Sequence, residues 1–149
     1  MKKYTELINN SLSKHGLSVK RKRGIGYAFL YEGIEMSFTI FPSDDGSIRC
    51  RFIVPRIVRV PKRGISQYKD SVNELNQMMI GAKFYIYNKS IWSVHEFCLF
   101  ENEHLDECID YALSVLSSSV LLTKMKTEDR KSSRLNSSHQ WKSRMPSSA

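Results

Sequence analysis

The amino-acid sequence predicts an α+β domain in which helices pack on an antiparallel sheet, with the elements in the order α-β-β-β-α-β-β-α. Two observations lead to this prediction. Three segments place apolar residues at the spacing of an amphipathic helix, and the segments between them are short, rich in aromatic and β-branched residues, and joined by tight turns. Strands joined by hairpins pair antiparallel, so we expect the helices to cover one face or the ends of the sheet.

Each element follows from a local pattern. Residues 34–41 alternate apolar and polar side chains, as a half-buried strand does, and Glu32-Gly33 before them suits a hairpin turn. Met78 and Met79 fall on the expected inner face of the middle helix, and Asn102 suits the N-cap of the last helix. In chain order, we expect a helix at 2–15, strands at 27–31, 34–41 and 47–54, a helix at 65–80, strands at 83–87 and 90–100, and a helix at 103–124. Residues 17–23 are a candidate for an extra short strand, which this order leaves open.

The last 21 residues, 129–149, have a pattern of their own. Suitable codons for residues 129–132 and 134–139 reproduce the start of a common sequencing adapter, and codons for residues 143–149 reproduce its far end. Ser133 is the residue of the first stretch that departs from it. We therefore expect a single domain at 1–128 and a non-native, disordered tail from adapter read-through at 129–149. A native, flexible, serine-rich basic terminus is the alternative.

Charge and composition limit the function classes. The whole chain has 23 Lys and Arg against 15 Asp and Glu, a net charge of +8. Without residues 129–149 the counts are 18 and 14, so the net charge is +4, which weakens the case for a nucleic-acid-binding protein. The three cysteines form no regular framework, and the N-terminus lacks the apolar core of a signal peptide. No apolar run suggests a bilayer span, so we expect a cytoplasmic protein without membrane contact.

Catalytic and metal-binding motifs are missing from the sequence. His95 and Cys98 lie three apart in a predicted strand and should face opposite sides, whereas His104 and Cys108 share a helical face without further ligands nearby. Gly24-Ile25-Gly26 lacks the third glycine, the following helix and the lysine of a phosphate loop, so a hairpin or strand bend is the better interpretation. We expect no enzymatic activity, no metal and no cofactor.

Cationic residues form the most prominent predicted surface feature. One run is Lys20-Arg21-Lys22-Arg23, and a second cluster lies at the strand 47–54 and in the basic connection that we expect at 55–64. This second cluster is our candidate binding patch: Arg49, Arg51, Arg56, Arg59, Lys62 and Arg63. A patch of this kind suits an acidic protein or, with nearby tyrosines, single-stranded nucleic acid. A solvated sheet edge whose charges deter aggregation is the simpler explanation.

The strand at 90–100 is apolar on both faces. A strand of this kind is either central and covered or lies at an interface. Trp92, Val94 and Phe100 share one face and form our candidate apolar interface.

The element order resembles that of the bacterial YbjN-like family. The stretch Val72-Asn73-Glu74-Leu75-Asn76, followed by Lys83-Phe84-Tyr85-Ile86-Tyr87, carries this resemblance, together with a closing helix after Ser93-Val94-His95-Glu96-Phe97. Family members are similar in fold to the type III secretion chaperones, which grip extended segments of effector proteins. The resemblance implies a non-enzymatic regulatory or chaperone-like role, often as a dimer.

The sequence therefore predicts a protein-binding module of YbjN-like type that grips a protein segment through an exposed strand or groove, as a monomer or a homodimer. Two alternatives remain open. One is a nucleic-acid-binding regulator that uses the basic patch, and the other is an immunity-type inhibitor of a toxin.

Overall fold

The computed structural model of the chain describes residues 2–24, 26–100 and 104–143. Within these residues, three helices and six antiparallel strands form an α+β fold, which confirms the predicted class and order. The elements are α1 (Lys2–Ser13), β1 (Lys20–Lys22), β2 (Gly26–Tyr31), β3 (Ile34–Pro42), β4 (Ile48–Arg59), α2 (Ile65–Met78), β5 (Lys83–Tyr87), β6 (Ser90–Leu99) and α3 (Leu105–Ser143).

The six strands form one sheet in the order β1-β2-β3-β4-β6-β5. Two hairpin turns have the sequences that the pattern predicted. Glu32 and Gly33 both have positive φ, at 52° and 78°, and so do Asn88 and Lys89, at 48° and 64°. Two consecutive residues with positive φ match the right-handed twist of the strands that they join. The turns therefore fix the pairing of β2 with β3 and of β5 with β6.

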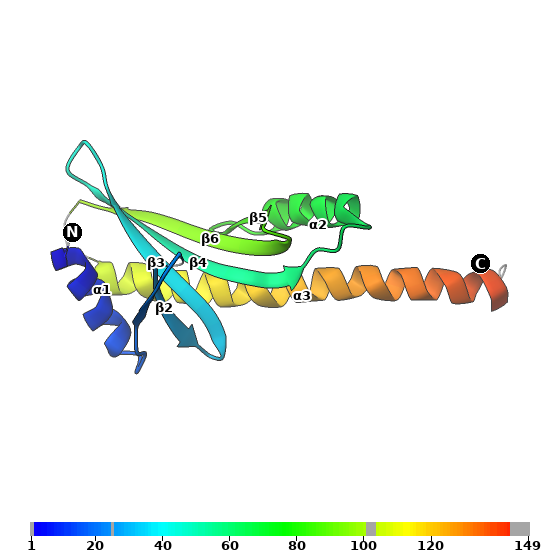
Figure 1. The fold of residues 1–149 in the computed structure, drawn as a ribbon, viewed down its shortest axis with the longest axis horizontal. Helices are drawn as coiled ribbons and strands as arrows, with labels where there is room; N and C mark the ends of the chain where they lie inside the picture. Colours follow the sequence, from blue (N-terminus) through cyan, green and yellow to red (C-terminus); the bar gives the residue numbers. More distant parts are fainter. Residues whose placement is uncertain (1, 25, 101–103, 144–149) are drawn as a thin grey trace.

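Helices cover only one face of this sheet. Helix α3 packs against β4 and β6, α1 packs against α3, and α2 packs against β5 and α3 (Figure 1). None of the described helices crosses the opposite face, which we call the open face. Asn76 of α2 also occupies the outer edge of β5, because its side chain donates to the carbonyl of Phe84 and accepts from the Phe84 backbone N–H. That edge is therefore closed to a further strand.

Stacked aromatic side chains form the middle of the core between the sheet and α3. Phe52 of β4 is fully buried and stacks between Phe38 of β3, with ring centroids 5.6 Å apart, and Phe97 of β6, at 5.8 Å. Ile109 and Leu116 of α3 are also fully buried in this cluster. Burial of a large apolar side chain stabilises a fold by about 1.5–3 kcal/mol, so this layer holds the sheet against the helix.

Strand β4 is longer than the sequence indicated. We expected it to end near Val54, with a basic connection at 55–64, but β4 continues to Arg59. A bulge between Val54 and Val58 absorbs Pro55, which lacks the N–H that regular pairing needs, and Arg56, whose φ is 48°. Arg56 and Arg59 therefore belong to the sheet.

Helix α2 also departs from prediction at its end. It stops at Met78, and the Met78 side chain is 58% exposed instead of facing inward. Met79 is extended, with φ −115° and ψ 127°, and its side chain packs, partly buried, against the core, so the inward prediction holds for Met79 and is wrong for Met78.

Helix α3 begins at Leu105, and the predicted N-cap, Asn102, lies outside the described residues. We expected the helix to end near Lys124, but it continues to Ser143, beyond the sheet and α2 (Figure 1). Residues 105–143 contain neither proline nor glycine, so no breaker stops the helix earlier. Whether 129–149 are native stays a prediction.

One part of α3 contradicts our expectation that no segment resembles a bilayer span. Leu105–Glu128 has the length and mean hydropathy, 1.2, of a membrane-crossing helix. The same segment carries the buried apolar stripe that packs against β4 and β6. A core helix of this kind has the same length and apolar composition as a membrane-crossing helix.

Candidate functional site: the open face of the sheet

The open face is defined by register, because directly paired residues on neighbouring strands point to the same side. Its members alternate with the core residues along each strand. They are Lys20, Lys22, Gly26, Ala28, Leu30, Glu35, Ser37, Thr39, Phe41, Arg49, Arg51, Ile53, Arg59, Lys83, Tyr85, Tyr87, Ser90, Trp92, Val94, Glu96 and Cys98.

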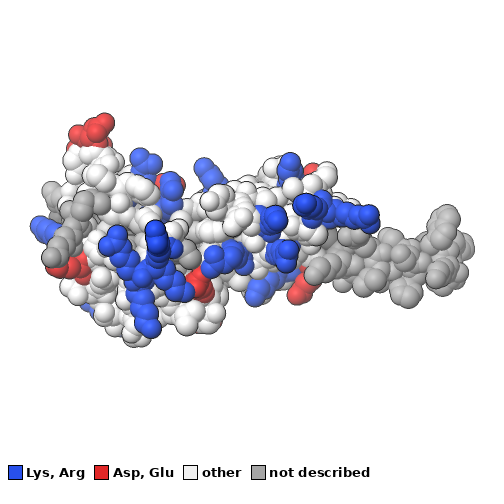
Figure 2. Space-filling view, in the orientation of Figure 1, with Lys and Arg blue, Asp and Glu red and all other residues white. Residues whose placement is uncertain are grey.

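Cations dominate this face. Six of the register-defined members are Lys or Arg, and Arg56 joins them from the bulge, against two carboxylates, Glu35 and Glu96, among the described residues. Figure 2 shows blue side chains gathered over this side of the molecule. The face therefore attracts acidic ligands at a distance and repels basic ones.

Each of the two carboxylates holds two cations from different strands. Lys22 Nζ of β1 donates to Glu35 Oε2 at 2.9 Å, and Arg56 Nη2 of the bulge donates to Glu35 Oε1 at 2.8 Å. On the other side, Arg51 Nε donates to Glu96 Oε1 at 3.3 Å, and Arg49 Nη1 lies 3.9 Å from Glu96 Oε2. These pairs keep the cationic side chains over the sheet instead of pointing freely into solvent.

Aromatic rings lie among these charges. Trp92 of β6 stacks on Tyr85 of β5, with centroids 6.3 Å apart, and meets the ring of Tyr87 edge to face at 5.2 Å. The guanidinium of Arg56 lies 6.0 Å from the Trp92 ring, and that of Arg51 lies 5.0 Å from the ring of Phe41. Burial raises the pKa of the Tyr85 hydroxyl, and the nearby positive charge of Arg51 partly offsets this increase.

The structure divides the predicted binding patch. Arg49, Arg51, Arg56 and Arg59 share the open face, because the bulge keeps β4 in the sheet through residue 59. Lys62 and Arg63 are exposed but lie in the connection between β4 and α2, outside the sheet register.

The predicted apolar interface is divided in the same way. Trp92 and Val94 lie on the open face, where Trp92 is half-buried and Val94 is 8% exposed beside Ile53 and Lys83. Phe100 lies just past the end of β6 and is 68% exposed.

Sequence reasoning missed that Lys22 belongs to this face, and it missed the ion pairs of Glu35 and Glu96 with the cations. The polar alternation of residues 34–41 had placed Glu35 on a solvent face. No signal in the sequence linked Glu35 or Glu96 to particular arginines, because the pairs join residues 13 to 47 positions apart.

His95 and Cys98 lie on opposite sides of β6. His95 faces the core and its Nδ1 contacts the carbonyl oxygen of Gly81 at 2.5 Å, whereas Cys98 is exposed on the open face, as the spacing predicted. Burial raises the pKa of Cys50 to about 12, which keeps it a thiol at neutral pH. No cluster of three metal-ligating side chains occurs within the described part of the chain.

Comparison with known proteins identifies a similar fold. No family model matches this sequence, and neither does any curated protein. Among solved structures, the chain is similar to YbjN of E. coli, a candidate transcription regulator, with a TM-score of 0.55 and 10% sequence identity. The match covers 82% of this chain and 92% of that one. The chain therefore has a YbjN-like fold, in agreement with the resemblance in the sequence.

Proposed function

We propose that this protein is a non-enzymatic regulatory module that binds an acidic, extended segment of another protein across its open face. One observation carries the proposal: seven cationic side chains and exposed aromatic rings share a sheet face that the described helices leave uncovered. Arginine, tyrosine and tryptophan are the residues that contribute most to binding at protein interfaces. YbjN, the structural neighbour, is also described as a candidate regulator.

The segment would cross the strands instead of extending the sheet. Asn76 fills the edge of β5, and the opposite edge is β1, a strand of three exposed Lys and Arg residues. Neither edge offers the long, free hydrogen-bonding row that strand addition uses. Six strands about 4.8 Å apart span about 24 Å, which roughly seven extended residues can cross.

The two carboxylates favour a polypeptide over a nucleic acid. A phosphate backbone carries a charge at every nucleotide and would pass close to Glu35 and Glu96. A polypeptide can place acidic residues over the arginines and neutral residues elsewhere. Leu30 and Tyr87, which are 64% and 60% exposed, also give apolar side chains of a partner something to cover.

A displayed library of peptides of about ten residues, selected on residues 1–149, tests this proposal. We expect the enriched peptides to combine acidic with aromatic or aliphatic residues. Their affinity, measured by fluorescence anisotropy, should fall roughly two- to thirtyfold in Arg49→Gln/Arg51→Gln, because two contacts of part-exposed arginines, worth about 0.2–1 kcal/mol each, are removed. Lys14→Gln/Lys69→Gln removes the same charge from two exposed positions, one just after α1 and one on α2, and should leave the affinity almost unchanged.

Peptides of random charge, or an equal loss of affinity in both double variants, would refute the proposal. The second candidate, single-stranded nucleic acid, is supported by the stacked pair Tyr85 and Trp92 under Arg56, since bases stack on such rings. Tighter binding of an unstructured oligothymidine than of any selected peptide would favour it.

A further inference from the structure

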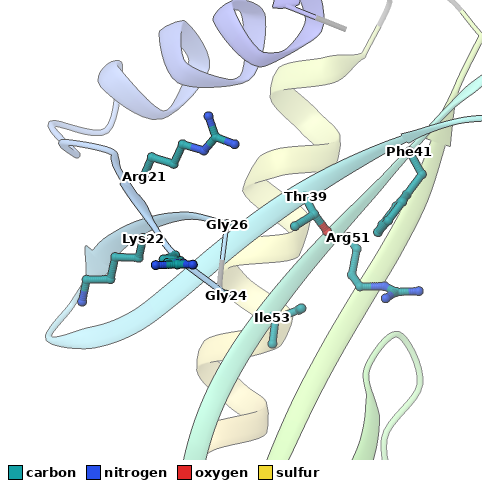
Figure 3. Close-up of a pocket in the computed structure, with 9 residues that line it drawn as sticks. Arg21, Lys22, Gly24, Gly26, Thr39, Phe41, Arg51 and Ile53 are labelled. Carbon is teal, nitrogen blue, oxygen red and sulfur yellow. The ribbon is translucent and has the colours of Figure 1, made fainter.

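The proposed function uses the open face, including its corner at Gly26. The strands approach so closely there that a Cβ atom at Gly26 would lie 2.8 Å from the Phe38 carbonyl oxygen. Figure 3 shows this corner, where Arg51 extends from β4. Its guanidinium is already held by Glu96, at 3.3 Å. The opposite side of the molecule, where α3 turns away from the sheet, carries a separate inference.

Helix α3 has two opposite sides of different character. One side is buried, where Ile109, Leu113 and Leu116 join the core beneath the sheet. The other side faces solvent, and its exposed residues follow one another at alternating steps of three and four. We call this row the outer ridge: Glu107, Tyr111, Ser114, Ser118, Leu121, Met125 and Glu128. The alternating step is that of the contact seam of a coiled coil.

Large apolar side chains on the outer ridge are exposed. Leu121 is 63% exposed and Met125 is 52% exposed, and half of the Tyr111 side chain faces solvent. The Tyr111 ring is held edge to face against His95, with centroids 5.2 Å apart. Apolar side chains aligned in this way on a helix mark a surface for another protein element. Ser114 and Ser118 lie among them and are small, so a second helix can approach closely.

The neighbouring helices contact α3 on its two flanks and not on the outer ridge. On one flank, Lys14 and His15, just after α1, pair with Asp106 at 2.7 Å and Asp110 at 2.6 Å. On the other flank, α2 pairs with α3 through Lys126 and Glu74 at 2.6 Å. Within the described residues, these contacts leave the ridge itself open.

The spacing along the ridge fits a second copy of the same helix. When two copies of α3 run antiparallel, with Ser114 of each facing Ser118 of the other, Tyr111 of each faces Leu121 of the other. The small residues then lie at the centre, and an aromatic–aliphatic pair closes the interface on both sides. A surface that complements itself in this way is typical of a twofold dimer.

Charge favours the antiparallel orientation. Asp110 and Lys124 lie on the same flank of the ridge, one at each end of its apolar part, and both are exposed. The antiparallel arrangement places Asp110 of each copy beside Lys124 of the other, as flanking charges do in coiled coils. Asp110 also pairs with His15, but its side chain is 59% exposed and can accept a second cation. Parallel helices would instead place Glu107 against Glu107.

We propose that two copies of this chain associate through their outer ridges as an antiparallel pair of α3 helices. The dimer does not use the open face and does not depend on the function proposed for it. Because α3 lies on the opposite side of the sheet, the two open faces of a dimer point outward. A partner with two acidic segments would then be bound at both faces, which raises its apparent affinity.

Sedimentation of the full chain over a range of concentrations up to about 1 mM tests the dimer. Few large side chains meet in the interface, so we expect a weak dimer with a Kd on the order of 100 µM. Leu121→Glu/Met125→Glu should weaken it at least tenfold, because four carboxylates would meet apolar side chains. Met78→Glu/Ile80→Glu is the matched control, since both residues are exposed and lie at the end of α2 and just after it. Thermal melts establish that each variant is folded.

Disulfide trapping tests the orientation and gives a second readout. Ser114→Cys and Ser118→Cys are made in separate chains in which the exposed native thiol is removed by Cys98→Ser. The two chains are then mixed with oxidised glutathione. Antiparallel helices bring residue 114 of one copy to residue 118 of the other, so mass spectrometry should show the mixed dimer as the main product. Parallel helices would link each variant to itself.

Four results would overturn the proposal. They are a monomer at about 1 mM, which would leave the ridge to a different partner, an equal weakening in the two double variants, a main product that links each cysteine variant to itself, and no trapped dimer. The peptide selection is read through Arg49 and Arg51 on the open face, so either proposal can fail while the other stands.

Discussion

Replacing Glu96 by Gln is the sharpest perturbation of the open face. The Glu96 carboxylate holds Arg51 at 3.3 Å and Arg49 at 3.9 Å, and glutamine keeps its shape while removing the charge. If acidic residues of a partner bind these arginines, Glu96 competes with them inside the free protein. Removing that competitor should strengthen binding, which is the reverse of what loss of an ordinary contact residue does.

The magnitude follows from exposure. The side chains of Arg49, Arg51 and Glu96 are 48%, 37% and 36% exposed, so each pair is of the surface kind and is worth about 0.2–1 kcal/mol. Two such pairs amount to about 0.4–2 kcal/mol, which corresponds to a decrease of roughly two- to thirtyfold in the Kd of an acidic peptide. The free energy of unfolding should fall by no more than the same small amount.

Anisotropy titrations with a selected acidic peptide, repeated at several salt concentrations, measure the Kd, and urea unfolding measures stability. Glu107→Gln is the matched control, because Glu107 is exposed on α3 and pairs with His104, away from the open face. A Kd for Glu96→Gln that is unchanged, raised, or lowered only as much as in Glu107→Gln would refute the idea that Glu96 occupies the binding arginines.

Three further predictions concern stability and reactivity. Hydrogen bonds from Lys14 and Ser11 lower the pKa of Asp106 in the folded protein. The ionised carboxylate therefore stabilises the fold at pH values above its ordinary pKa of 3.8, and this stabilisation is lost as the pH falls through the lowered pKa. Unfolding curves should therefore show Asp106→Asn less stable at pH 7 and nearly equal to the parent in strong acid; a constant gap would contradict this. Gly26→Ala should destabilise by about 2–4 kcal/mol and Gly33→Ala, where nothing lies within 4 Å, by about 1–2 kcal/mol in the same assay; equal losses would argue against the close approach. At pH 7.5 a maleimide should modify Cys98 rapidly and Cys50 only on unfolding, as mass spectrometry of digests can show; early labelling of Cys50 would contradict its burial.

Local chemistry explains why the fold was predictable. Hairpin turns such as Glu32-Gly33 are specified by adjacent residues, and the period of an amphipathic segment shows which side is buried. The end of β4 was not predictable in this way, because Pro55 and the basic residues after it are typical of a loop. Pairing with β6 resumes at Val58, and that pairing depends on a strand more than 30 residues away, which no local pattern contains.

The binding surface was predictable only in its composition. The clustering of Arg49 and Arg51 with Arg56 and Arg59 is visible in the sequence, but their common face depends on the bulge that returns β4 to the sheet. Which side chains share a face depends on the register of the strands. Turn geometry sets this register, and the composition of a single strand does not reveal it.

The two carboxylates also explain how a face with seven cations can remain uncovered. Lys22 and Arg56 come from the two sides of β3, and Arg49 and Arg51 from one strand, so without Glu35 and Glu96 these like charges would repel one another across the sheet. Each carboxylate reduces that repulsion while leaving the outer parts of its partners exposed. A partner's acidic residues can then replace an interaction that is individually weak, at sites where the arginines are already oriented. On the proposed function, stability of the free face and binding of an acidic ligand would therefore both depend on the same four ion pairs.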